Sequence, residues 1–173
     1  LCDRRQRQMC IRDSSFGGAE LAARLKAVSA DHLLHISDTG IKRLARSGTI
    51  ATLLPLTAFS LNEPYAPGRR MIDAGCAVAL ASDLNPGSCF SSSIPLLFAL
   101  ACIQMKLTPE EALTALTING AAALGREKKV GSIDVGKKAD LVLLKFPSYK
   151  FLPYHIGMNI VDTVIKDGVL YIV

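Results

Sequence analysis

Apolar residues in this chain follow two patterns, a helical spacing of three to four positions and short continuous runs. Leu21 and Leu25 lie four positions apart, and so on one face of a helix. The helical pattern predicts helices at 18–26, 38–46, 69–74, 94–106 and 108–124. The continuous apolar runs predict strands at 27–30, 49–56 and 76–81.

Polar residues at the ends of two of these helices act as start and stop signals. Ser37 or Asp38 is expected to cap the helix at 38–46, and Gly48 is expected to end it. Thr108 is followed three positions later by Glu111, which is the spacing of a capping box. The boundaries of these two helices are therefore predicted from local chemistry alone.

The order of the elements predicts an α/β protein. Strands that are apolar on both faces and alternate with helices are typical of a parallel sheet covered by helices. After Gly125 the pattern changes to short apolar runs separated by glycines, with predicted strands at 130–134, 139–146, 161–165 and 169–173. We expect this tail to form an antiparallel sheet appended to the α/β part.

The first 14 residues differ in composition from the rest of the chain. They hold four arginines against two aspartates, so +2 of the formal net charge of +5 falls in this leader, and they show neither helical nor strand periodicity. We interpret residues 1–14 as a disordered leader foreign to the fold. The alternative is a basic RNA-binding arm. The remaining charge is dispersed without a basic stripe, and the chain lacks Trp, so we expect no nucleic-acid partner.

Composition narrows the protein class further. Half of the residues are hydrophobic, which is enough for a packed core. The longest apolar stretch, 94–103, is shorter than the ~20 residues of a membrane-spanning helix, so we expect no membrane partner. The five cysteines are odd in number and widely spaced, which predicts reduced thiols in a cytoplasmic protein. A complete barrel enzyme takes ~250 residues, so a chain of 173 would be part of one.

Two polar residues follow predicted strands at the edge where parallel α/β folds bind ligands. Asp83 comes directly after the run at 76–81, and His32 follows the strand at 27–30. A carboxylate in this position is costly unless it meets a cation, hydrogen-bond donors or water. The alternative for Asp83 is a cap of the following turn, and the alternative for His32 is a hydrogen-bonded core histidine.

The loop after Asp83 offers further candidate groups. Asn85 supplies an amide, Gly87 allows close backbone approach, and Ser88 supplies a hydroxyl, so the loop is a weak candidate for binding a carboxylate or amide. We interpret His35 as structural and His155 as a surface or packing residue. The chain contains no phosphate-binding glycine loop, His-x-His pair, Cys-x-x-Cys pair or serine nucleophile elbow.

Four runs taken together resemble the amidohydrolase superfamily and, within it, the imidazolonepropionase family. They are SADHL at 29–33, LPLTAFSL at 54–61, ASDLNPGS at 81–88 and GSIDVGKKADLV at 131–142. The resemblance begins at Phe16 and implies the C-terminal part of a (β/α)8 barrel at 15–125, with part of a small β-sandwich at 126–173. It implies hydrolysis of the cyclic amide of 4-imidazolone-5-propanoate to N-formimidoyl-L-glutamate, a step of histidine degradation.

The resemblance also implies roles for individual residues. Asp83 matches the aspartate after the eighth strand, which binds one divalent metal, zinc or iron, and moves the proton of the attacking water. His32 matches the catalytic histidine after the sixth strand, and the loop with Asn85, Gly87 and Ser88 matches the one that holds the substrate. A small-molecule substrate and, for the intact enzyme, a homodimer are implied as partners.

The sequence departs from this pattern at the metal ligands. The family's metal site also needs a His-x-His pair after the first barrel strand and a histidine after the fifth, and this chain has neither. A catalytic zinc takes three protein ligands, so we expect the chain alone to bind metal weakly and to be inactive. Part of a barrel also leaves an open strand edge, which favours association. The alternatives are another aminohydrolase of the superfamily, acting on a nucleobase, and a non-catalytic α/β interaction module.

Overall fold

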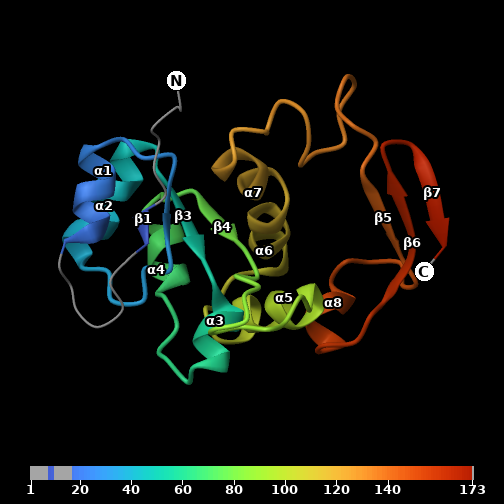
Figure 1. Cartoon of the computed structure of the whole chain (residues 1–173), viewed down its shortest axis with the longest axis horizontal. Helices are drawn as coiled ribbons and strands as arrows, with labels where there is room; N and C mark the ends of the chain where they lie inside the picture. The colour runs from blue at the N-terminus through green and yellow to red at the C-terminus, as the bar shows by residue number, and fades with distance from the viewer. Residues whose placement is uncertain (1–7, 10–16, 173) are drawn as a thin grey trace.

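The computed structural model describes residues 8–9 and 17–172, which form two sheets separated by helices (Figure 1). The first sheet is parallel, in the order β1-β2-β3-β4. Its strands are β1 (Gln8–Met9), β2 (Ser29–Asp31), β3 (Ile50–Leu53) and β4 (Val78–Leu80). The second sheet is antiparallel and consists of β5 (Leu141–Leu144), β6 (Val161–Lys166) and β7 (Val169–Ile172). The predicted mixed architecture of a parallel sheet followed by an antiparallel tail is confirmed.

One face of the parallel sheet packs against helices to form the main core. Ala30, Ala51 and Val78 lie in one row across β2, β3 and β4, and all three are buried in this core. The same core takes side chains from α1 (Gly18–Arg24), α2 (Asp38–Ser47), α4 (Gly68–Asp73), α5 (Ile94–Ile103) and α6 (Pro109–Leu116). On the opposite face, Ile50 and Ala79 contact Ala123 of α7 (Ile118–Ala123). Both faces of the central strands are thus covered, as the unbroken apolar runs predicted.

The predicted helix caps are present. The Ser37 hydroxyl accepts a hydrogen bond from the Gly40 N–H at 2.9 Å at the start of α2, and Gly48 ends the helix with φ +74°. In α6, the Thr108 hydroxyl accepts from the Glu111 N–H, and the Glu111 carboxylate accepts from the Thr108 N–H. Both caps satisfy backbone donors that the helix itself leaves unpaired.

The prediction of one strand at 49–56 is wrong in its second half. β3 ends at Leu53, and α3 (Pro55–Ser60) follows almost at once. Proline fixes φ near the helical value and has no N–H to leave unpaired, so it is well suited to the first position of a helix. The apolar character of this segment reflects burial of the first turn of α3 rather than a continued strand.

The prediction of one helix at 108–124 is also wrong, because the backbone breaks at Thr117 (φ −106°, ψ −94°) between α6 and α7. The break allows the Asn119 side chain to donate to the Val78 carbonyl of β4 at 2.8 Å. Gly131 packs closely on the same junction, where an added Cβ would lie 2.9 Å from the Ile118 Cα. Segments distant in sequence thus contact the chain at this break.

The tail differs from the prediction at two places. Residues 130–134 form no strand, since Gly131 adopts φ +95° and the side chain of Ile133 is 87% exposed. A short helix, α8 (Phe151–Tyr154), lies where we predicted none, beside α5. The other three predicted tail strands correspond to β5, β6 and β7.

The leader is not wholly outside the fold, which corrects one expectation. Gln8 and Met9 form β1 and pair in parallel with Ala30 and Asp31 of β2. The rest of the leader, including Cys2 and Cys10 and the predicted disorder, lies outside the described residues. Cys76, Cys89 and Cys102 are free thiols. No helix in the described part of the chain combines the length and apolar character that crossing a membrane requires.

Candidate functional site

Three chain segments leave the parallel sheet at the same edge. The His32 N–H donates to the Thr52 carbonyl at 3.0 Å, and the Ala81 N–H donates to the Leu53 carbonyl at 3.2 Å. These bonds continue the β2–β3 and β3–β4 ladders just beyond the strands. The segments after β2 and β4 and the start of α3 therefore converge at the carboxyl edge, where parallel sheets bind ligands.

His32 and Asp83 lie together at this edge. The distance between the His32 Nε2 and the Asp83 Oδ2 is 3.8 Å. The imidazole side chain is 7% exposed and the carboxylate side chain 29% exposed, so the histidine is enclosed while the aspartate still reaches solvent. The expectation that parallel strand ends bring these two residues together is borne out by the geometry; their chemical roles remain a proposal.

Thr57 is a third member of the site and was not singled out from the sequence. Its hydroxyl donates to the Asp83 Oδ2 at 2.8 Å, and the residue is 2% exposed. The available signal was a hydroxyl within the apolar run 53–58, just after a strand, because most buried hydroxyls have a hydrogen-bond partner. An interpretation of this run as a strand followed by a loop conceals the signal, because it places Thr57 outside any helix.

Three residues at the site have a left-handed backbone conformation, which is unfavourable for residues other than glycine. His32, Leu33 and Asp83 have φ values of +69°, +59° and +53°. Left-handed backbone at residues other than glycine costs about 1–3 kcal/mol each, and such residues cluster at functional sites. The Leu33 side chain is 1% exposed, and burial of a leucine contributes about 1.5–3 kcal/mol, which offsets the cost at that residue.

A small apolar pocket adjoins the buried histidine. Its lining includes His32, Leu54, Pro55, Tyr65 and Met105. Burial raises the pKa of the Tyr65 phenol, so this side chain stays neutral and its hydroxyl keeps its proton. The pocket wall beside the imidazole thus carries no charged side chain.

The loop after Asp83 is organised by Asn85. The Asn85 Oδ1 accepts from the Gly87 N–H at 2.9 Å and the Ser88 N–H at 2.8 Å, while its Nδ2 donates to the Asp83 carbonyl at 2.7 Å. These bonds form a side-chain-closed turn. Within the described residues, no N–H of the loop donates a hydrogen bond to the Asp83 carboxylate. The side chain that caps this turn is that of Asn85, and not that of Asp83 as the alternative interpretation expected.

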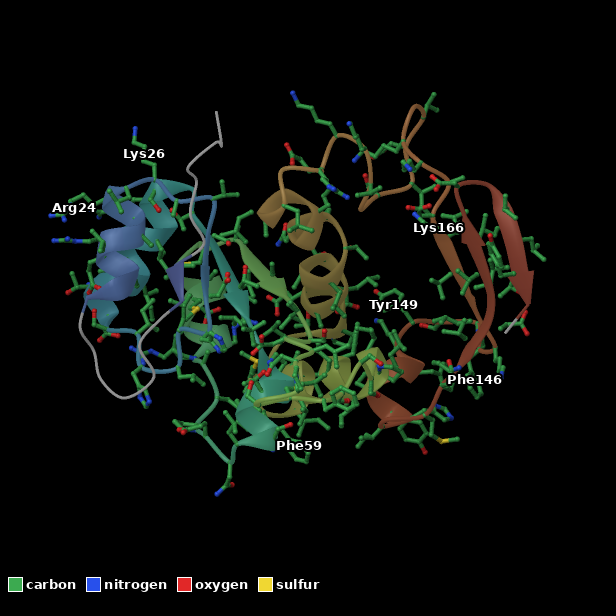
Figure 2. The ribbon with its side chains drawn as sticks, viewed as in Figure 1. Arg24, Lys26, Phe59, Phe146, Tyr149 and Lys166 are labelled. Carbon is green, nitrogen blue, oxygen red and sulfur yellow. The ribbon has the colours of Figure 1, made fainter. Side chains whose placement is uncertain are left out.

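The described residues contain no cluster of three or more potential metal ligands. His32 and Asp83 supply two donors, one fewer than the protein ligands of a catalytic zinc. His35 is exposed, and His155 stacks on Phe146 with ring centroids 4.4 Å apart. Figure 2 shows Phe146 beside the antiparallel sheet, well away from Phe59 on α3. His155 therefore packs on an aromatic side chain, as expected.

Comparisons with known proteins agree on the family. The sequence model of the amidohydrolase family matches residues 15–171. The imidazolonepropionase of Parabacteroides distasonis is 83% identical over 156 residues, covering 90% of this chain and 38% of the relative. That of Bacteroides fragilis is 72% identical over 155 residues, covering 90% and 37%. The chain thus spans well under half the length of these relatives.

Solved structures share the fold. A zinc-bound adenosine deaminase from Xanthomonas campestris superimposes with a TM-score of 0.79 at 25% identity, covering 90% of this chain and 40% of the deaminase. The guanine deaminase of E. coli superimposes with a TM-score of 0.69 at 19% identity, covering 86% and 40%. Since the family match extends over nearly all of the described residues, the chain belongs to the amidohydrolase family.

Proposed function

We propose that this chain carries part of the active site of an imidazolonepropionase, which hydrolyses 4-imidazolone-5-propanoate to N-formimidoyl-L-glutamate. The 83% identity to the Parabacteroides distasonis enzyme supports this substrate. The single observation that carries the proposal is the placement of His32 Nε2 within 3.8 Å of Asp83 Oδ2 at the carboxyl edge of the sheet. This edge is where barrel enzymes hold their catalytic residues.

The fold assignment that goes with this function is part of a (β/α)8 barrel. We assign β2, β3 and β4 to the sixth, seventh and eighth barrel strands, within a partial barrel at 15–125. Residues 126–173, with the antiparallel sheet, are assigned to part of a β-sandwich domain. The family match begins at residue 15, so Gln8 and Met9 lie outside the matched residues although they pair with β2.

The reaction requires one proton to move and one carbonyl to be polarised. Water adds its oxygen to the ring carbonyl carbon, the C–N bond breaks, and the leaving nitrogen takes a proton. Asp83 is suited to accept the water proton and return it to the nitrogen, because its carboxylate reaches solvent and lies beside an imidazole. His32 is assigned to the carbonyl oxygen, and the loop of Asn85, Gly87 and Ser88 to the substrate.

A divalent metal, zinc or iron, is part of the proposal for the intact enzyme. The described residues do not fit such an ion by themselves, since they offer two donors where a catalytic zinc has three protein ligands. We assign Asp83 as one ligand and expect the others from parts of the enzyme that this chain does not span. In such sites the ion lowers the pKa of water and supplies hydroxide near neutral pH.

A second candidate is an aminohydrolase acting on a nucleobase. It is favoured by the structural likeness to an adenosine deaminase, at 25% identity. The much higher identity to imidazolonepropionases, and the match of the loop at 85–88 to that family, support the first candidate over this one.

A chimera tests the proposal with this chain's own residues in a full-length enzyme. The 156 residues of this chain that align would replace the corresponding segment of the Parabacteroides distasonis enzyme. We expect the purified chimera to consume 4-imidazolone-5-propanoate, followed by its ultraviolet absorbance, and to leave adenosine and guanine unchanged. A folded chimera without turnover, or one that deaminates either purine, would refute the proposed function.

A further inference from the structure

Thr57 is a polar side chain in an apolar environment. It lies in the first turn of α3, where Pro55, Leu56 and Ala58 are buried as well. Within the described residues its hydroxyl makes one hydrogen bond, to the Asp83 Oδ2, which joins two residues 26 positions apart. Thr49 provides the contrast, because its hydroxyl is equally buried and has no hydrogen-bond partner in the described part of the chain. A buried threonine in this fold thus does not need such a bond in order to be accommodated.

The bond distinguishes the two oxygens of the Asp83 carboxylate. Oδ2 accepts from Thr57 at 2.8 Å and is also the oxygen 3.8 Å from the His32 Nε2. No hydrogen bond from the described residues reaches Oδ1. One oxygen is therefore held by Thr57, while the other accepts no hydrogen bond from the described residues and belongs to a side chain that is 29% exposed.

Asp83 needs an external restraint to hold this orientation. Its side chain is 29% exposed, its backbone is left-handed, and the loop at 84–93 begins at the next residue. An exposed side chain on a loop exchanges between rotamers unless a contact selects one. The Thr57 hydroxyl lies on a helix turn packed into the core and is a fixed donor.

We infer that Thr57 is a positioning residue: its hydroxyl selects the Asp83 rotamer in which Oδ2 faces His32 and Oδ1 is available for the reaction. The inference rests on the proposed function of Asp83. Asp83 is proposed as a metal ligand, and partners that orient metal-ligating side chains typically contribute 10–100-fold to metal affinity or activity. Thr57 acts through Asp83 and is not assigned a contact with the substrate.

The orientation can be measured in the 173-residue chain without any activity. Three-bond NMR couplings of Asp83 report whether its χ1 angle occupies one rotamer or several. We expect one rotamer in the wild type, in Thr57→Ser and in the control Thr49→Val, and averaging in Thr57→Val and Thr57→Ala. An unaltered Asp83 rotamer in both Thr57→Val and Thr57→Ala would overturn the inference.

The consequence for activity is measured in the chimera. We expect Thr57→Val to lower kcat by roughly 10–100-fold with little change in KM, Thr57→Ser to restore most of it, and Thr49→Val to leave it unchanged. An active chimera in which Thr57→Val equals Thr49→Val would overturn the positioning role and leave the proposed function standing. An inactive wild-type chimera would overturn both.

Discussion

Replacing Gly131 with alanine tests how the tail is attached to the α/β part. An added Cβ at this position would lie 2.8 Å from the Ala121 Cβ, 2.9 Å from the Ile118 Cα and 3.0 Å from the Thr117 carbonyl oxygen. Two of these three atoms belong to the backbone and cannot rotate away. The junction between α6 and α7 would have to shift, and with it the helix whose Asn119 holds β4.

The expected magnitude has two parts. Gly131 has φ +95°, and left-handed backbone costs an alanine about 1–2 kcal/mol. Overpacking against the α6–α7 junction adds about 1–3 kcal/mol. Gly136 is the matched control, since its φ is +88° and an added Cβ there would meet nothing within 4 Å. Gly136→Ala should therefore show the backbone cost alone.

Urea unfolding of the 173-residue chain, followed by circular dichroism, separates the two parts. With a urea m-value of about 2 kcal/mol/M, Gly131→Ala should unfold at about 0.5–1.5 M less urea than Gly136→Ala. Equal midpoints for the two variants would refute the close packing of Gly131 on the junction.

Three further outcomes follow from the described contacts. The Arg69 guanidinium lowers the pKa of Glu111 by hydrogen bonding, so the stabilisation by ionised Glu111 is present above about pH 4.3 and is lost on acidification. Between about pH 5 and pH 3, the free energy of unfolding should therefore fall less in Glu111→Gln than in the wild type. An equal fall in the two proteins would contradict this. Burial, with nearby Glu110 and Glu111, raises the pKa of Cys102 to about 11, so its alkylation at about pH 8, followed by peptide mass spectrometry, should be slower than for a free thiol. Dialysis of the chain against zinc should leave less than one ion per molecule, because the described residues hold no three-donor cluster; stoichiometric zinc with turnover would contradict this.

Local chemistry was enough to predict several elements of the fold. The ends of α2 follow from Ser37 and Gly48, and the start of α6 follows from the Thr108–Glu111 capping box. All residues of each capping motif lie within a few positions of one another in the sequence. The meeting of His32 with Asp83 was also predictable, because parallel strands place their carboxyl ends at one edge.

Features that depend on distant contacts were missed. The break at Thr117 coincides with contacts from Val78 and Gly131, which no local pattern reveals. The prediction of a strand for the residues after β3 is wrong because a short continuous apolar run does not distinguish a buried strand from a buried short helix. That error hid Thr57, whose role is visible only once α3 is placed beside Asp83.

The most direct test of the central claim is the Asp83→Asn variant of the chimera, with Asp73→Asn as its control. Asparagine keeps the size of the side chain but cannot take up a proton, whereas Asp73 lies on the surface of α4 with its side chain 63% exposed. We predict that Asp83→Asn lowers kcat for 4-imidazolone-5-propanoate by at least about 100-fold while Asp73→Asn retains full activity. Equal activity of the two variants would contradict the assignment of Asp83 to the hydrolytic site.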